Sequence, residues 1–183
     1  MTLEALMDTV PSYAKDLKLN FSSLVMQQTE LTPQQNWGTV VSTAIASKNA
    51  SLTRAVTEEA SKVMSPQALE AAKSAAAIMG MNNIFYRFHH LTSNEKYATL
   101  PTRLRMNAIR SHGIAQEDFE LWCIAVSAIN GCGKCVDSHE RVVRDKGMSE
   151  EQIMAAIRIA AVVHALAAVF DAEDALRAER AAA

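Results

Sequence analysis

Apolar residues recur along the chain at intervals of three and four, the spacing that places side chains on one face of an α-helix. The clearest example is 116–129, where Phe119, Trp122, Cys123 and Val126 fall on one stripe. No stretch shows the alternation of apolar and polar residues that is typical of a half-buried strand. The pattern therefore predicts an all-α protein.

Helix starts and stops are marked by particular residues. Thr32-Pro33 and Ser65-Pro66 each place a capping side chain before a proline, which favours the first turn of a helix. Asn130-Gly131 predicts a break, and Gly147 predicts a helix end. Polar connections are expected at 92–99 and after 169. The expected helices cover about 2–9, 12–23, 32–47, 50–63, 65–79, 81–90, 101–109, 116–129, 132–146 and 149–169.

An internal repeat relates the two halves of the chain at an offset of 84 or 85 residues. The matched residues are Trp37, Val41, Ser42, Met64, Ser65, Ala71 and Ala72 with Trp122, Val126, Ser127, Met148, Ser149, Ala155 and Ala156. Each copy is predicted to contain two helices, a Met-Ser cap and an Ala-rich helix. We therefore expect one domain, 1–183, built from two related helical units at about 32–90 and 115–170.

Composition and net charge limit the classes of function and the cellular compartment that we expect for this protein. The net charge of -2 gives no basic field for binding nucleic acid or an anionic membrane. The longest apolar run, within 160–170, is interrupted by His164, so no membrane-spanning segment is expected. The N-terminal residues lack the features of a signal peptide. Three cysteines are too few for a disulfide scaffold, which favours a reducing cytoplasm and a catalytic or metal-binding use of a Cys pair.

Four residues form a candidate active site with the spacing E-x11-C-x2-C-x3-H: Glu120, Cys132, Cys135 and His139. Two cysteines three positions apart at a helix start can cycle between dithiol and disulfide, and the helix N-terminus favours a thiolate. A carboxylate and an imidazole can take protons from thiols. Antiparallel packing of the two helices would bring Glu120 over His139. Lys134 either helps to stabilise a thiolate or faces solvent.

The repeat supports a chemical purpose for these residues. Side chains needed only for packing should tend to appear in both units, and these four do not. Their counterparts in the first unit are Gln35, Ser47, Ala50 and Arg54.

Other interpretations of the polar and sulfur-containing residues are open. The Cys pair could be buried and inert, or it could bind zinc together with Glu120 and His139, although structural zinc sites usually add a second short-spaced pair. No metal site is expected. Cys123 is predicted to be a buried thiol, His89-His90 to end a helix, His112 to be solvated, and His164 to be a hydrogen-bonded core or interface residue.

The chain resembles the alkylhydroperoxidase D family, within the carboxymuconolactone decarboxylase-like superfamily, over nearly its whole length. That resemblance implies an all-helical fold, commonly a homotrimer, with hydroperoxidase activity. It also implies re-reduction by the dihydrolipoamide of a lipoyl-bearing acyltransferase in a 2-oxoacid dehydrogenase complex, and it admits a peroxiredoxin as a further partner. No bound cofactor is implied. The matching segments are 11–16, 79–83, 119–122, 125–132 and Cys135-x-x-x-His139.

The resemblance also implies roles for the four site residues. Cys135 resembles the thiol that attacks the peroxide, Cys132 its disulfide partner, and Glu120 and His139 the proton relay. Lys134 stands where family members can carry a relay histidine, and lysine does not readily shuttle protons near neutral pH. Helix position further predicts that Cys132 is the more exposed sulfur and the one attacked by the reductant.

We therefore expect a dithiol peroxidase. One alternative is a lyase of the carboxymuconolactone decarboxylase type, although such a reaction would not require a redox-active pair of cysteines. The other is a zinc-binding or redox-sensing interaction protein.

Overall fold

The computed structural model describes residues 1–182, and helices account for most of them, with no strand in that range. The all-α prediction is therefore confirmed. Six helices of eleven residues or more form the body: α3 (Pro33–Ser47), α4 (Ala50–Ala60), α5 (Pro66–Leu91), α7 (Gln116–Ile129), α8 (Gly133–Asp145) and α9 (Glu150–Ala182). The shorter elements are α1 (Leu3–Met7), η1 (Ser12–Ala14), α2 (Lys15–Phe21), η2 (Ser22–Met26), α6 (Lys96–Thr99) and η3 (Asn107–Ile109).

The expected capping signals start three of the long helices. The Thr32 hydroxyl accepts a hydrogen bond from Gln35 N, and the Gln35 side chain accepts one from Thr32 N, which completes a capping box at the start of α3. Ser65 caps α5 and Ser149 caps α9 in the same manner, each accepting from the backbone three residues later.

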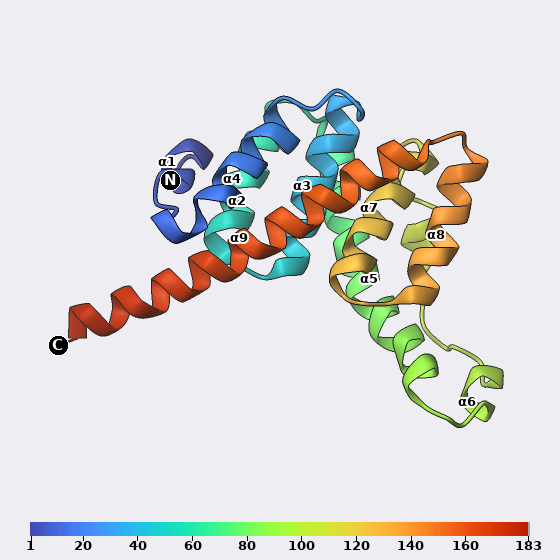
Figure 1. The fold of residues 1–183 in the computed structure, drawn as a ribbon. Helices are drawn as coiled ribbons and strands as arrows, with labels where there is room; N and C mark the ends of the chain where they lie inside the picture. Colours follow the sequence, from blue (N-terminus) through green and yellow to red (C-terminus); the bar gives the residue numbers. More distant parts are fainter. Residues whose placement is uncertain (183) are drawn as a thin grey trace.

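Helices α3 and α7 lie at the centre of the molecule. α3 packs against α5, α7 and α9, and α7 packs in addition against α8 (Figure 1). Trp122 on α7 is fully buried, and its indole N–H donates to Gln35 O on α3 over 3.1 Å. The free ends of α5 and α9 project from this body on different sides (Figure 1). The flanking helices, including α8, therefore pack against the central pair of α3 and α7, which fixes their positions.

The structure corrects three expected boundaries. A single helix, α5, replaces the two expected at 65–79 and 81–90 and runs straight through Gly80. The helix expected at 101–109 is absent: most of the segment is irregular, Arg103 has a left-handed φ of 51°, and only one short turn, η3, forms at its end. α9 continues well past 169, so the residues expected to form a tail are helical as far as 182.

Two related expectations also need correction. By length and composition alone, the stretch Glu150–Ala178 of α9 could cross a membrane, contrary to our expectation, because one histidine at 164 does not end the apolar run. Half (50%) of its most apolar window is nevertheless buried in this fold, as in a core helix of a soluble protein. His164 itself is exposed and so is not a core residue, but it is hydrogen bonded as expected, with its Nδ1 3.2 Å from Ser47 Oγ. Its position in an interface stays a prediction.

The helix order agrees with the expected repeat. α3, α4 and α5 follow one another in the first half as α7, α8 and α9 do in the second. The superposition of the two halves in space, and the division into units at about 32–90 and 115–170, stay predictions.

Candidate functional site

The turn between α7 and α8 fixes the position of the Cys pair. Gly131 adopts a left-handed φ of 66°, which a glycine accepts without a steric penalty, and Cys132 then caps the N-terminus of α8. Cys132 N–H donates to Ser127 O over 3.1 Å. The sequence Asn130-Gly131 therefore produces the break that it predicts, and the pair starts at the mouth of a helix.

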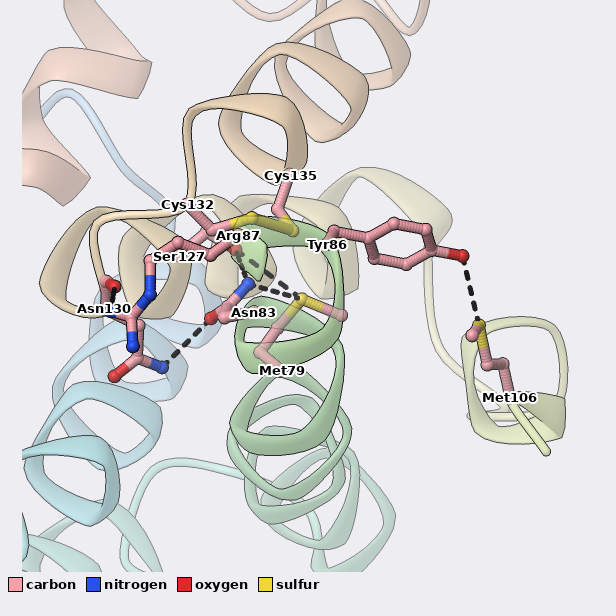
Figure 2. Close-up of a disulfide and its surroundings, with 9 residues drawn as sticks. All are labelled: Met79, Asn83, Tyr86, Arg87, Met106, Ser127, Asn130, Cys132 and Cys135. Carbon is pink, nitrogen blue, oxygen red and sulfur yellow. Dashed lines mark hydrogen bonds between the residues drawn. A yellow bond between two sulfur atoms is a disulfide. The ribbon is translucent and has the colours of Figure 1, made fainter. Parts of the chain in front are cut away.

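A polar network holds this turn from below (Figure 2). Asn83 on α5 donates from Nδ2 to Ser127 Oγ and accepts at Oδ1 from Asn130 Nδ2, both over 2.9 Å. Arg87, one turn further along α5, donates to Asn130 O. Sequence reasoning did not identify this brace, in which α5 fastens the turn that carries the Cys pair.

Cys132 and Cys135 form a disulfide, with their Cα atoms 5.3 Å apart (Figure 2). Cys135 N–H also donates to Cys132 O over 3.0 Å, as the first turn of α8 requires. Cys123, the third cysteine, is free and fully buried, as expected. Burial, and secondarily the charge of Glu120, raises the pKa of the Cys123 thiol well above its usual range. This thiol is therefore poorly suited to redox chemistry.

The two sulfur-bearing side chains differ in their access to solvent. Cys132 is 1% exposed and Cys135 is 5% exposed, and it is Cys135 that lines the adjacent cavity. The expectation that Cys132 is the more exposed residue is therefore wrong. Cys132 is the N-cap residue of α8 and does not line the cavity, whereas Cys135, inside the first turn, does.

Glu120 and His139 meet beside the same cavity, although they come from different helices. Glu120 Oε2 on α7 is hydrogen bonded to His139 Nδ1 on α8, and both side chains are buried. The antiparallel packing of α7 and α8 thus brings the carboxylate over the imidazole. His139 lies four residues after Cys135, which places the two side chains on one face of α8.

The hydrogen-bonded chain continues beyond Glu120 to residues that sequence reasoning missed. Gln116 Nε2 donates to the second carboxylate oxygen of Glu120, and Gln116 Oε1 lies 3.0 Å from His112 Nε2. The His112 ring stacks on Phe119 at a centroid distance of 4.2 Å, so it is packed rather than solvated. A signal for Gln116 existed in the sequence, because it precedes Glu120 by one helical turn.

The cavity beside these groups has a volume of about 370 Å³. Its lining combines apolar side chains with titratable groups. Its lining consists of Asn82, Tyr86, Met106, Ile109, Glu120, Lys134, Cys135, Ser138, His139 and Val142. The arrangement exposes one sulfur of a redox pair and a hydrogen-bonded His–Glu pair to a space of small-molecule size.

Lys134 lies at the exposed side of this cavity. Its Nζ is 5.5 Å from the centroid of the Tyr86 ring, within the range of a cation–π contact. The Tyr86 hydroxyl in turn points to Met106 Sδ, 3.8 Å away. Lys134 is therefore held over an aromatic ring at the cavity and is not simply directed into solvent.

An all-helical oxidoreductase with a C-x-x-C redox centre is the class that this fold and site define. Residues 95–178 match the Carboxymuconolactone decarboxylase family. The whole chain is 62% identical over 183 residues, covering 100% of both chains, to a protein of Acidobacterium capsulatum named alkyl hydroperoxide reductase AhpD. Proteins of that name from Koribacter versatilis (63% identical, 95% of this chain and 90% of that one) and Streptomyces coelicolor (54%, 98% and 100%) are also similar.

The chain therefore belongs to the alkyl hydroperoxide reductase AhpD family, whose members are peroxidase-type oxidoreductases. The resemblance seen in the sequence is confirmed.

Proposed function

We propose that this protein reduces alkyl hydroperoxides with the Cys132–Cys135 pair and that dihydrolipoamide restores the dithiol. The observation that carries the proposal is that Cys135 and the Glu120–His139 pair line one cavity. A redox sulfur, a base and room for a small substrate are the elements that thiol-dependent peroxide reduction requires.

The hydrogen bond between Glu120 and His139 favours one orientation of the imidazole. An ionised carboxylate can accept but not donate a hydrogen bond, so His139 Nδ1 carries the proton toward Glu120. Nε2 is then the ring atom with a lone pair, and it can take the proton of Cys135 directly or through water. Glu120 would stabilise the imidazolium that results, and Lys134 would not be needed as a shuttle.

The proposed cycle begins with the reduced pair. The Cys135 thiolate attacks the outer oxygen of the hydroperoxide, an S–O bond forms, and the O–O bond breaks. The leaving oxygen receives the proton held by His139, which gives an alcohol and a sulfenic acid on Cys135. The Cys132 thiol then attacks the sulfenic sulfur and releases water, which forms the disulfide.

Re-reduction would also take place through the cavity. Cys135 is the sulfur on the cavity wall, so we assign the attack of the external dithiol to Cys135 Sγ. Cys132 then leaves as a thiolate at the N-terminus of α8, where the helix dipole stabilises negative charge. A second thiolate of the dihydrolipoamide displaces Cys135 from the mixed disulfide.

We further propose a homotrimer in the cytoplasm, reduced by a lipoyl-bearing acyltransferase and able to serve a peroxiredoxin. The partners rest on the family resemblance. Self-association is supported by large apolar side chains that are exposed near the free end of α5 and α6, since contiguous exposed apolar surface commonly marks an interface. These residues are Ile84, Phe88, Leu91, Tyr97, Leu100 and Leu104. Light scattering of the purified protein would give the mass of the assembly.

The deciding experiment measures hydroperoxide consumption with dihydrolipoamide as the sole reductant. Cys132→Ser and Cys135→Ser should each abolish turnover, because one thiol cannot close the cycle. Mild oxidation of the reduced protein should remove two thiols and leave Cys123 free. Loss of Cys123 instead, or full turnover by either serine variant, would contradict the proposal.

The same purified wild-type and serine-variant proteins distinguish a peroxidase from the zinc-binding and lyase alternatives. Among the side chains that the structure describes, within residues 1–178, no group of three or more His, Cys, Asp and Glu is arranged to hold a metal ion. Metal analysis of the reduced protein would favour the zinc-binding alternative if it found about one zinc per chain. A lyase of the carboxymuconolactone decarboxylase type would retain its activity in both serine variants.

A further inference from the structure

Asn82 on α5 is a buried polar residue in the wall of the active-site cavity. Its side chain is 3% exposed, and it lines the cavity together with Cys135 and His139. Its Oδ1 atom is buried and has no hydrogen-bond partner among the described residues. A buried polar atom left unpaired destabilises the folded state, so a packing role alone would be better served by an aliphatic side chain.

The neighbouring asparagine shows what a structural role looks like at this point of α5. Asn83 is 0% exposed, and both ends of its amide are hydrogen bonded, to Ser127 and to Asn130. Asn83 therefore braces the turn that carries the Cys pair (Figure 2). Asn82 faces the cavity and takes no part in that brace.

We propose that Asn82 binds the peroxide group of the substrate, an inference that rests on the function proposed above. An amide offers one acceptor and two donor hydrogens, whereas a hydroperoxide offers one O–H donor and two acceptor oxygens. The two groups are therefore complementary. The amide oxygen would accept from the outer O–H, and the amide nitrogen would donate to the inner oxygen, which leaves when the O–O bond breaks.

This contact would act on the reaction in two ways. It would hold the outer oxygen toward Cys135, and it would stabilise the negative charge that grows on the leaving oxygen before His139 delivers its proton. Asn82 itself transfers no atom or electron. The electron pair of the Cys135 thiolate forms the S–O bond, and the pair of the O–O bond goes to the leaving oxygen.

Two reactions of Cys135 distinguish this role from a general effect on the thiol. Attack on a hydroperoxide expels an oxygen that a hydrogen bond can stabilise, whereas alkylation by iodoacetamide expels iodide, which gains little from such a bond. Both reactions require the thiolate. Asn82→Leu keeps the size of the side chain and removes its hydrogen bonds. Its rates should be measured by rapid mixing of the reduced protein with an alkyl hydroperoxide, and by alkylation of Cys135 in a Cys132→Ser background.

We expect Asn82→Leu to slow the peroxide reaction by about 10–100-fold, somewhat less than the loss of a donor to a full oxyanion. Its alkylation rate should stay within about twofold of the Cys132→Ser parent. Asn36→Leu is the matched control, because Asn36 Oδ1 is also buried with no hydrogen-bond partner in the described part of the chain, while its Nδ2 donates to Val25 O, away from the cavity. The control should leave both rates unchanged. If Asn82→Leu fails to fold, Asn82→Ala serves the same comparison.

The outcomes separate this inference from the proposed function. A wild-type protein that does not react with hydroperoxides overturns both. A reactive wild-type protein and an Asn82 variant with the same peroxide rate overturn the inference alone. An equal loss in peroxide reduction and alkylation also overturns it, because Asn82 would then act on the thiol and not on the peroxide.

Discussion

Glu120 Oε2 and His139 Nδ1 are hydrogen bonded although the two residues stand 19 positions apart on different helices. Both side chains are buried, so the bond forms where water competes weakly for the carboxylate and the imidazole. A buried carboxylate would be costly without such a partner. The pair is thus an element of the fold that can also supply a base to the cavity.

Substitution of either member of this pair should therefore reduce activity without unfolding the protein. Glu120→Gln keeps the shape and removes the proton-stabilising charge. We expect hydroperoxide turnover with dihydrolipoamide to fall by about 10²–10³, the usual range for loss of general-base assistance. His139→Gln should have a similar effect, and the double variant should lose little more, because residues of one relay act as a unit.

Glu117→Gln on the same helix is the control, since Glu117 takes no part in the cavity lining. Circular dichroism should give the same helix content for all variants. Normal turnover by Glu120→Gln, with an unchanged pH dependence of Cys135 alkylation, would remove Glu120 from the mechanism.

Gln116 should contribute through Glu120. Its Nε2 donates to one carboxylate oxygen, while His139 occupies the other. Gln116→Leu removes that donor, and we expect turnover to fall about fivefold, which corresponds to one hydrogen bond of about 1 kcal/mol. His112→Phe should cost less, because it keeps the stacking on Phe119 and loses a contact one step further away.

A double-mutant cycle tests whether the effect passes through the carboxylate. On a Glu120→Gln background, Gln116→Leu should change turnover by less than about twofold. The same fivefold loss on both backgrounds would show that Gln116 acts on the stability of α7 and not on the relay.

Cys123 should make the oxidised protein less stable at alkaline pH. Burial, and secondarily the charge of Glu120, raises the pKa of this thiol well above its usual range, so the folded protein keeps the proton when the unfolded chain has lost it. The folded state then binds more protons, and the free energy of unfolding decreases as the pH rises through the unfolded pKa. The loss can reach about 1.4 kcal/mol per pH unit for one group.

Urea unfolding of the wild type and of Cys123→Ala between pH 7 and pH 10 would measure this effect. The alanine variant should be the less stable protein near neutrality, because it leaves a cavity. Its disadvantage should then shrink above about pH 8.5, where an unfolded thiol ionises. A stability difference that stays constant over the whole range would contradict the prediction.

The sequence singled out the four candidate residues because their spacing is local. Their catalytic roles stay predictions, and the sequence alone could not identify the partners that lie outside this spacing. Cys132, Cys135 and His139 fall on one helix start, whereas the approach of Glu120 depends on how α7 packs on α8. His112 looked solvated because a Ser-His-Gly loop gives no sign that the ring will stack on Phe119. The greater burial of Cys132 also depends on α5, which lies beneath the turn (Figure 2).

Two of the three helix boundaries that were wrong have a common cause. Gly80 suggested a break, but one glycine in a helix costs only about 1 kcal/mol. Burial of Met79, Asn82 and Asn83 on either side favours a continuous α5. Conversely, Pro101 suggested a helix start, but the chain here is irregular as far as Met106 and forms only the short turn η3, and Met106 and Ile109 both line the cavity. In both places tertiary contacts outweigh local propensity.

Two glycines on long helices should respond to alanine in opposite directions, because their surroundings differ. A Cβ added at Gly38 on α3 would overlap the indole of Trp122 on α7, so the two central helices could not keep their approach. We expect Gly38→Ala to lower the free energy of unfolding by about 1–3 kcal/mol, as overpacking of a core does.

A Cβ at Gly80 would meet no atom within 4 Å, and that position is exposed in the middle of α5. Gly80→Ala should therefore raise the free energy of unfolding by about 0.5–1 kcal/mol. Urea unfolding of the oxidised variants measures both changes, and Trp122→Phe should relieve part of the loss in Gly38→Ala. If Gly38→Ala were as stable as the wild type, α3 and α7 would not approach as closely as this fold requires.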